Sequence, residues 1–168
     1  MRKVLILFGQ LTDRDVRWLV DHGTVRATSP EDTLIERGQT VDSLFLVLDG
    51  YLSVFYGARA VAELEAGDVV GEMSFLDGRP PSATVRGKSQ GQVLEVPRAA
   101  LEEKLQRDTG FASRFYRALG MFLSFRLRQV ETIDGEDSDE LDPNILDSLS
   151  AAGDRFARLC QQLEARDP

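Results

Sequence analysis

The feature that most limits the fold of this chain is the sequence pattern of residues 24–96. Over this stretch, short runs rich in Val, Leu, Phe and Tyr alternate with Gly, Pro and Asp-Gly turn signals. Runs this short and this close indicate an antiparallel β-sandwich or a small barrel. The Asp49-Gly50 pair predicts a hairpin between the two runs that flank it. The predicted strands are residues 33–35, 44–48, 51–56, 59–64, 69–70, 83–85 and 93–96.

Helical patterns lie on both sides of this β-rich stretch. Thr12 and Asp15 have the spacing of a capping box, which predicts a helix that ends at Gly23. Two more helices are predicted after the strands, over residues 99–105 and about 110–133. The fold class is therefore mainly β with flanking helices.

The helix predicted over about residues 110–133 has a wider apolar surface than packing against one neighbouring element requires. Phe111, Phe115, Leu119 and Phe122 form one stripe, and further apolar residues lie beside it. One interpretation is a core helix with a ragged stripe. The other is a helix that meets its own copy in a second subunit, and a symmetric homodimer is our expectation.

Acidic residues are concentrated at the C-terminal end. The net charge is −8; residues 132–168 contain ten acidic and three basic residues, and residues 1–131 contain 18 and 17. Residues 134–142 have no basic residue and are predicted to be a solvated linker, and residues 143–164 are predicted to be an amphipathic helix. We expect one domain over residues 1–131, followed by this linker and helix. No basic run exists to neutralise a phosphate backbone, so no nucleic-acid partner is expected.

Several classes of protein are excluded by what the sequence lacks. One cysteine and one histidine rule out a disulfide framework and a multi-histidine metal site. No nucleophile with a paired base is apparent, so we expect neither an enzyme nor a bound cofactor. The apolar run Val4 to Phe8 is too short for a membrane span or a secretory segment. A cytoplasmic location is therefore expected.

The most informative passage is residues 71–85, GEMSFLDGRPPSATV. Gly71 allows a close backbone approach, and Glu72 stands at the start of a short helical turn that ends at Gly78. Exposed amides of such a turn can bind an anion, and a carboxylate beside them can accept hydrogen bonds from a sugar hydroxyl. Arg79-Pro80-Pro81 is then a stiff connection to the next strand. The passage predicts a site for a small anionic ligand.

This passage, with Gly38, Gly50 and Gly67 in their strand context, resembles the cyclic-nucleotide-binding domain over about residues 12–130. The resemblance implies an eight-stranded antiparallel jelly-roll barrel, here about residues 24–96, with a phosphate-binding cassette. It implies that Glu72 binds the ribose 2′-hydroxyl and that backbone amides line the sugar-phosphate. Residues 79–85 and 115–128 also resemble small bacterial proteins of this fold. The implied ligand-binding residues are Gly71, Glu72, Met73, Ser74, Arg79, Ser82 and Ala83.

One cassette position departs from the family pattern. The arginine that pairs with the cyclic phosphate falls on Pro81, which has neither charge nor amide hydrogen. Loss of one partner of a buried charge pair costs about 2–5 kcal/mol, so binding of cAMP or cGMP is expected to be weak or absent. Arg79 is the first candidate to replace the missing cation, because residues i and i+2 of an extended chain face the same way. Arg86 is a second candidate.

Two functions from different classes follow. The first is a non-enzymatic regulatory and sensory module for signalling, which binds cAMP, cGMP or another small anionic ligand. The second is an interaction or scaffold protein with a degenerate pocket, which dimerises and docks a protein partner through its C-terminal helix. The sequence leaves open whether that helix packs in its own chain, in a second subunit or on another protein.

Overall fold

The computed structural model of this chain describes residues 2–30, 32–131 and 143–166. Backbone contacts divide the chain into two units. Leu19–Lys104 form the first, here called the sheet unit. Met1–Trp18 together with Leu105–Pro168 form the second, here called the helical unit. The linker predicted over residues 134–142 lies outside the described residues, and the predicted boundary of a domain at residue 131 stays a prediction.

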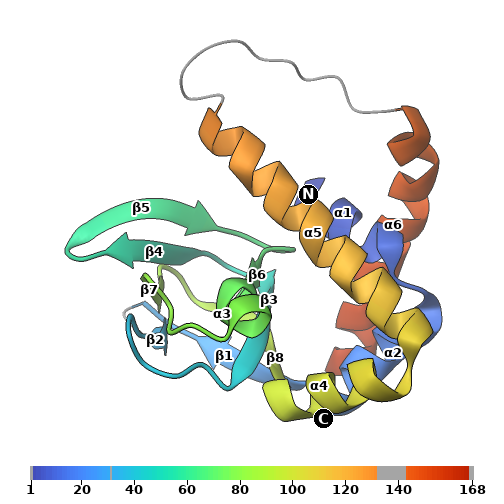
Figure 1. The fold of residues 1–168 in the computed structure, drawn as a ribbon, viewed down its shortest axis with the longest axis horizontal. Helices are drawn as coiled ribbons and strands as arrows, with labels where there is room; N and C mark the ends of the chain where they lie inside the picture. The colour runs from blue at the N-terminus through green and yellow to red at the C-terminus, as the bar shows by residue number, and fades with distance from the viewer. Residues whose placement is uncertain (1, 31, 132–142, 167–168) are drawn as a thin grey trace. The chain divides into compact units, whose positions relative to one another are not determined.

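The sheet unit holds two four-stranded antiparallel sheets (Figure 1). Sheet A has the order β1-β8-β3-β6, and sheet B has the order β2-β7-β4-β5. No strand pairing among the described residues closes these sheets into one barrel, so the predicted eight-stranded antiparallel fold is present as two sheets. The strands are β1 (Thr24–Thr28), β2 (Thr33–Ile35), β3 (Ser43–Asp49), β4 (Leu52–Tyr56), β5 (Arg59–Leu64), β6 (Val69–Val70), β7 (Thr84–Gly87) and β8 (Gly91–Pro97).

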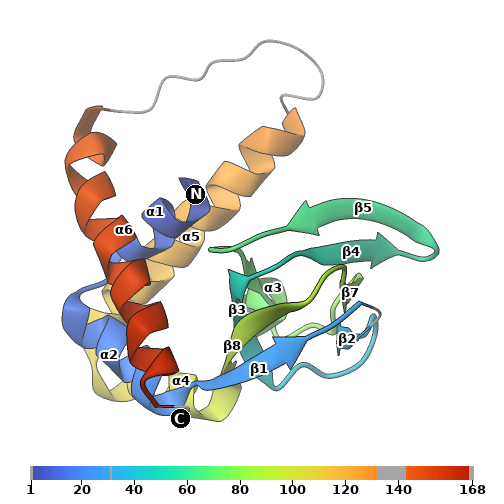
Figure 2. The same cartoon turned by 180° about the vertical axis from the view of Figure 1, so that it is seen from behind.

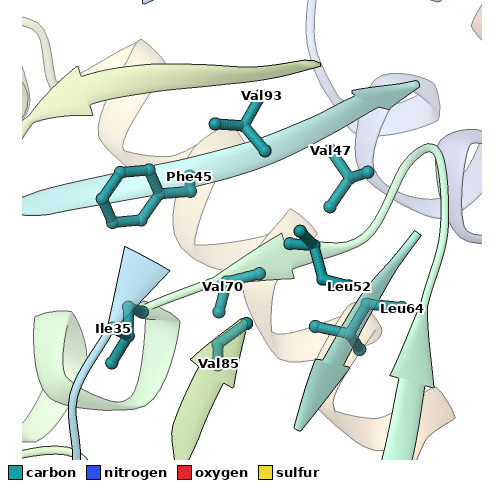
Figure 3. Close-up of a cluster of buried hydrophobic side chains, with 8 residues drawn as sticks. All are labelled: Ile35, Phe45, Val47, Leu52, Leu64, Val70, Val85 and Val93. Atoms are coloured by element: carbon teal, nitrogen blue, oxygen red, sulfur yellow. The ribbon is translucent and has the colours of Figure 1, made fainter. Parts of the chain in front are cut away.

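A core of aliphatic side chains and one phenylalanine lies between the two sheets (Figure 3). Each sheet contributes four of its members. Side chains alternate between the two faces of a strand, so residues two apart, such as Phe45 and Val47, enter the same core. The core residues are Phe45, Val47, Val70 and Val93 from sheet A, and Ile35, Leu52, Leu64 and Val85 from sheet B.

The hairpin predicted at Asp49-Gly50 is wrong. Strand β3 pairs with β6 and β8, whereas β4 pairs with β5 and β7, so this turn carries the chain from sheet A to sheet B. Gly50 fits here because a Cβ on it would lie 2.7 Å from the Cα of Gly91. The tight hairpin lies one strand later, where Tyr56 pairs with Arg59 across two residues.

Six helices accompany the strands in the described residues, and one of them was not predicted. Helix α1 (Arg2–Gln10) places Val4, Leu7 and Phe8 in the core. Their spacing is helical, but the run lacks a capping signal and its burial depends on other helices. The others are α2 (Asp13–His22), α3 (Glu72–Asp77), α4 (Arg98–Arg107), α5 (Thr109–Glu131) and α6 (Pro143–Glu164).

The predicted capping box of α2 is confirmed. The backbone N–H of Thr12 donates to Asp15 Oδ2 at 2.8 Å, and the N–H of Asp15 donates to Thr12 Oγ1 at 3.3 Å. Two amides at the start of the helix are thereby satisfied reciprocally. The predicted end at Gly23 is also confirmed, since its N–H donates to the carbonyl of Leu19.

In the helical unit, α1 lies between α5 and α6 (Figures 1 and 2). The α5 stripe predicted from the sequence is fully buried. Helix α6 buries Ala152, Leu159 and Leu163, and its Phe156 ring meets the Phe8 ring edge-on at 5.4 Å. The C-terminal helix therefore packs against the N-terminal helix of its own chain, which answers the question that the sequence left open.

Charged side chains join the helices of this unit. Asp15 is 1% exposed and accepts two hydrogen bonds from Arg114 of α5, at 2.7 and 2.8 Å. Burial alone would raise the pKa of Asp15, but hydrogen bonds from Arg114 and Thr12 outweigh it and hold the pKa below its usual value. Arg155 of α6 donates to Asp13 at 3.0 Å and to the carbonyl of Phe8 at 3.0 Å.

Within the described parts of the chain, no helix is both long enough and apolar enough to cross a membrane.

Candidate functional site

The predicted cassette begins where strand β6 ends. Gly71 follows with φ 88° and ψ 0°, a left-handed conformation that disfavours any residue with a side chain. A Cβ at this position would also lie 3.0 Å from the carbonyl oxygen of Ser43 in β3. The close backbone approach predicted for Gly71 is therefore present, and its neighbour is strand β3. The tight turn directs the chain into the six-residue helix α3.

Helix α3 buries one side of its first turn and exposes the other. Glu72 is 3% exposed and Ser74 is 6% exposed, whereas Met73 is 59% and Leu76 is 43% exposed. Full burial of a carboxylate is costly and is rarely seen without a partner. The fold therefore places the carboxyl group of Glu72 inside the unit, at the position where the sequence predicts a ligand contact.

Arg98, the first residue of α4, stabilises the far end of α3. Its Nη1 donates to the carbonyl of Ser74 at 3.1 Å, and its Nε donates to Glu102 at 2.7 Å. Its guanidinium also lies over the ring of Phe75, 5.6 Å from the centroid. A cation here suits the carbonyl end of a helix. Sequence reasoning missed Arg98, because a contact across 24 residues leaves no local signal.

The chain leaves α3 through Gly78, whose N–H donates to the carbonyl of Ser74 at 3.0 Å, so the predicted end of the helix is confirmed. Arg79 follows, and its side chain is 84% exposed. Its backbone N–H donates to Asp77 Oδ1 at 2.9 Å, and its Nε lies 4.0 Å from Asp77 Oδ2. The guanidinium therefore lies in solvent beside Asp77, apart from the buried carboxylate of Glu72.

The second half of the cassette is attached to the loop after β2. The carbonyl of Pro81 accepts a hydrogen bond from the N–H of Gly38 at 2.9 Å, and Thr84 Oγ1 accepts one from the N–H of Arg37 at 3.2 Å. Ser82 is exposed and Ala83 is half-buried. Strand β7 then begins at Thr84. One hydrogen bond to the Pro81 carbonyl and one to the Thr84 hydroxyl thus attach this connection at both ends.

The other candidate cation, Arg86, is exposed and lies over the ring of Phe55 at 5.6 Å. The cassette thus contains one buried carboxylate and a proline at the expected cation position. Among the described residues, no group of three or more His, Cys, Asp or Glu side chains could hold a metal ion. Such a site can accept hydrogen bonds from hydroxyl groups through its carboxylate, but it has no buried cation to pair with a phosphate.

Comparisons with known proteins agree with this geometry. Residues 25–108 match the family model of the cyclic nucleotide-binding domain. The chain is 34% identical to the potassium channel AKT2 of Oryza sativa over 82 residues, which is 46% of this chain and 10% of AKT2. It is 26% identical to the cAMP-activated global transcriptional regulator CRP of Salmonella typhimurium over 108 residues, 61% of this chain and 51% of CRP.

A solved cyclic nucleotide-binding domain from Methylobacillus flagellatus shares the fold, with a TM-score of 0.67 and 24% sequence identity. The match covers 76% of this chain and 78% of that domain. This chain therefore belongs to the cyclic nucleotide-binding domain family, as its sequence predicted. It spans only a tenth of the length of AKT2 and half that of CRP.

Proposed function

We propose that this chain is a non-enzymatic regulatory module that binds a small anionic ligand at the cassette, and that cAMP or cGMP binds there only weakly. The burial of Glu72 directly after the left-handed Gly71 carries this proposal. A buried carboxylate at the head of α3 can accept two hydrogen bonds from vicinal hydroxyl groups of a ribose. The proposed ligand-binding residues are Gly71, Glu72, Met73, Ser74, Arg79, Ser82 and Ala83.

The weakness of binding follows from the second half of the cassette. Pro81 supplies no cation, and the Arg79 guanidinium is in solvent beside Asp77. A missing partner for the phosphate charge costs about 2–5 kcal/mol. A micromolar site would then become one of about tens of micromolar to millimolar affinity.

A second candidate function has its own support. The same two features, Pro81 and the exposed Arg79, favour an interaction or scaffold protein whose pocket no longer binds a ligand. Helix α5 exposes Tyr116 and Leu127, at 48% and 61%, which supports a homodimer in either case. Packing of α6 on α1 makes this helix less available to a protein partner. A cytoplasmic location is part of both proposals.

Isothermal titration of the nucleotide-free protein with cAMP and then cGMP tests the first function. The informative variant is Pro81→Arg, because it restores the cation and keeps the backbone carbonyl that Gly38 binds. We expect weak binding by the natural chain and binding tightened by about 30-fold or more in Pro81→Arg, which corresponds to 2 kcal/mol. Glu72→Gln should weaken binding in both backgrounds.

Arg79→Ala is the control for a displaced cation. If it abolishes binding by the natural chain, Arg79 enters the site and replaces the family arginine. No heat with either nucleotide, in the natural chain and in a folded Pro81→Arg variant alike, would exclude a cyclic-nucleotide site and support the interaction function.

A further inference from the structure

The loop after β2 brings an arginine to the second half of the cassette. The backbone N–H of Gly38 donates to the carbonyl of Pro81 at 2.9 Å, and that of Arg37 donates to Thr84 Oγ1 at 3.2 Å. Residues 82–83, which belong to the proposed ligand site, lie between these two attachment points in the chain. The backbone of Arg37 is therefore held beside this part of the site.

The aromatic partner of Arg37 shows on which face of sheet B its charge lies. Leu52 of β4 points into the core (Figure 3), and Val54 packs against the same core. Because side chains alternate along a strand, Tyr56 is on the face of these two residues. The Arg37 guanidinium lies over the Tyr56 ring, 4.5 Å from its centroid, and Tyr56 is 57% exposed. The charge of Arg37 is thus on the inner face of sheet B, at the solvent-exposed end of that face.

The two other candidate cations are placed differently. Arg86 lies over the ring of Phe55, 5.6 Å from its centroid, and Phe55 alternates with the inward residues of β4, so this charge is on the outer face of sheet B. Arg79 is in solvent beside Asp77. No carboxylate in the described part of the chain lies within 4.0 Å of the Arg37 guanidinium. Of these three arginines, Arg37 is the one with an inward position and no carboxylate partner.

The contact with the Tyr56 ring leaves the chemistry of the Arg37 guanidinium available. A ring covers one face of a guanidinium, and the N–H edge remains free to donate. That edge matches two oxygens of one phosphate group in a bidentate arrangement. A guanidinium that is already stacked loses less freedom when it forms such a pair. Arg37 therefore has the chemistry of a phosphate-binding side chain.

We propose that Arg37 pairs with the phosphate group of the ligand and replaces the cation that Pro81 does not supply. This inference rests on the proposed function, in which a small anionic ligand contacts residues 82–83. It divides the recognition of a nucleotide between two elements: Glu72 binds ribose hydroxyl groups, and Arg37 binds the phosphate. Arg37 is exposed, so its pair with a phosphate is screened by solvent and salt, which agrees with weak binding.

The test compares cAMP with adenosine, which lacks the phosphate, in NMR titrations of the nucleotide-free full chain up to millimolar ligand. The natural chain should bind cAMP about tenfold more tightly than adenosine, the lower end of the usual range for a hydrogen-bonded charge. Arg37→Met keeps an apolar stem and removes the charge, so it should lower cAMP binding to the level of adenosine. The Nε–H resonance of Arg37 should shift with cAMP and not with adenosine.

Two further variants separate a specific pair from a general effect. Arg86→Met is the matched control, because Arg86 is also an exposed arginine over an aromatic ring, but on the opposite face of the sheet. It should keep the preference for cAMP, and an equal loss of preference in Arg86→Met would overturn the proposal. Pro81→Arg, added to Arg37→Met, should restore the preference. Failure to restore it would overturn the proposal, since the loss would then reflect damage to the site as a whole.

The outcomes distinguish this inference from the proposed function. If the natural chain prefers cAMP and Arg37→Met keeps that preference, the role of Arg37 is overturned and the ligand site remains. Equal binding of cAMP and adenosine by the natural chain would have the same meaning. If the natural chain binds neither ligand but Pro81→Arg binds cAMP, Arg37 does not reach the phosphate. Absence of binding in both chains would overturn the proposed function and this inference together.

Discussion

Backbone segments touch each other directly in the sheet unit, whereas charged and aromatic side chains join the helices of the helical unit. In the sheet unit, a Cβ on Gly87 would lie 1.9 Å from the carbonyl oxygen of Ser29, and one on Gly91 would lie 2.4 Å from that of Asp49. In the helical unit, Arg114 binds Asp15, and Phe156 packs on Phe8.

This difference has a consequence for regulation. A contact between two backbones depends on shape alone and does not respond to protonation or salt. A contact between ionised side chains responds to both. The sheet unit is thus suited to hold a ligand site of fixed geometry, and the helical unit is suited to change its stability with conditions.

The largest effect is expected for Gly87→Ala. The added methyl group would overlap the Ser29 carbonyl, and the N–H of Gly87 is already bonded to the carbonyl of Asp32 at 2.8 Å, so the strand has no room to shift. We expect a loss of more than about 4 kcal/mol in the free energy of unfolding, measured by urea denaturation. Gly120→Ala is the matched control in α5, where a Cβ meets nothing. This control should stabilise the protein by about 1 kcal/mol; equal losses in both would contradict the contrast.

Arg114→Met should cost about 3 kcal/mol, because it leaves the buried carboxylate of Asp15 without its charged partner. Arg114 is about one-third exposed, so the loss lies at the lower end of the usual range for broken buried pairs. Arg117→Met, on the exposed face of the same helix, is the control and should change stability by less than about 0.5 kcal/mol. Indistinguishable effects would show that the Asp15 pair contributes nothing specific.

The same pair should make stability depend on pH in acid. The pKa of Asp15 is lowered in the folded state, so its stabilising contribution is complete above its usual value of 3.8 and is lost as pH falls through the folded value. Asp32 has a lowered pKa as well, through hydrogen bonds from Ser29, but it is exposed. Unfolding measured between pH 5 and 2 should therefore show a shallower pH dependence in Arg114→Met than in the natural chain. Parallel curves would refute the role of Asp15.

Phe156→Ala should cost about 2 kcal/mol. The ring is only half-buried, so the loss is smaller than for a fully buried phenylalanine. Its edge-on contact with the fully buried Phe8 is the aromatic part of the packing between α6 and α1. Phe156→Leu keeps most of the volume and should recover about half of the loss. Hydrogen exchange of α6 should become faster in Phe156→Ala; unchanged exchange would mean that this contact does not hold α6.

Features that depend on residues close together in the sequence were predictable. The capping box of Thr12 and Asp15, the turn at Gly71 and the end of α3 at Gly78 each depend on residues a few positions apart. Seven of the eight strands could be located for the same reason, within one or two residues of their bounds, whereas β1 (Thr24–Thr28) was not predicted. The cassette could therefore be placed on the chain before its geometry was known.

Features that depend on distant residues could not be predicted. The Asp49-Gly50 turn has the composition of a hairpin, but its flanking strands find partners elsewhere, as Phe45 does with Glu95 across 50 residues. Arg98 reaches α3 from the next helix, and the burial of α1 depends on α5 and α6. In each case, packing between segments far apart in sequence determined the structure, and the local sequence did not indicate it.

The smallest effect is expected for Thr12→Ala, which tests whether the capping box of α2 contributes to the stability of the helical unit. Thr12→Ala removes the oxygen that accepts the Asp15 N–H at 3.3 Å, and it leaves the Arg114 pair in place. We expect a loss of about 1 kcal/mol, the usual value for an N-cap. Thr12→Ser keeps the oxygen and should recover nearly all of the lost stability.

Because Asp15 serves both the cap and the Arg114 pair, Thr12→Ala and Arg114→Met should be non-additive, by about 0.5 kcal/mol or more in a double-mutant cycle. Strict additivity would mean that the cap and the pair stabilise the two helices independently.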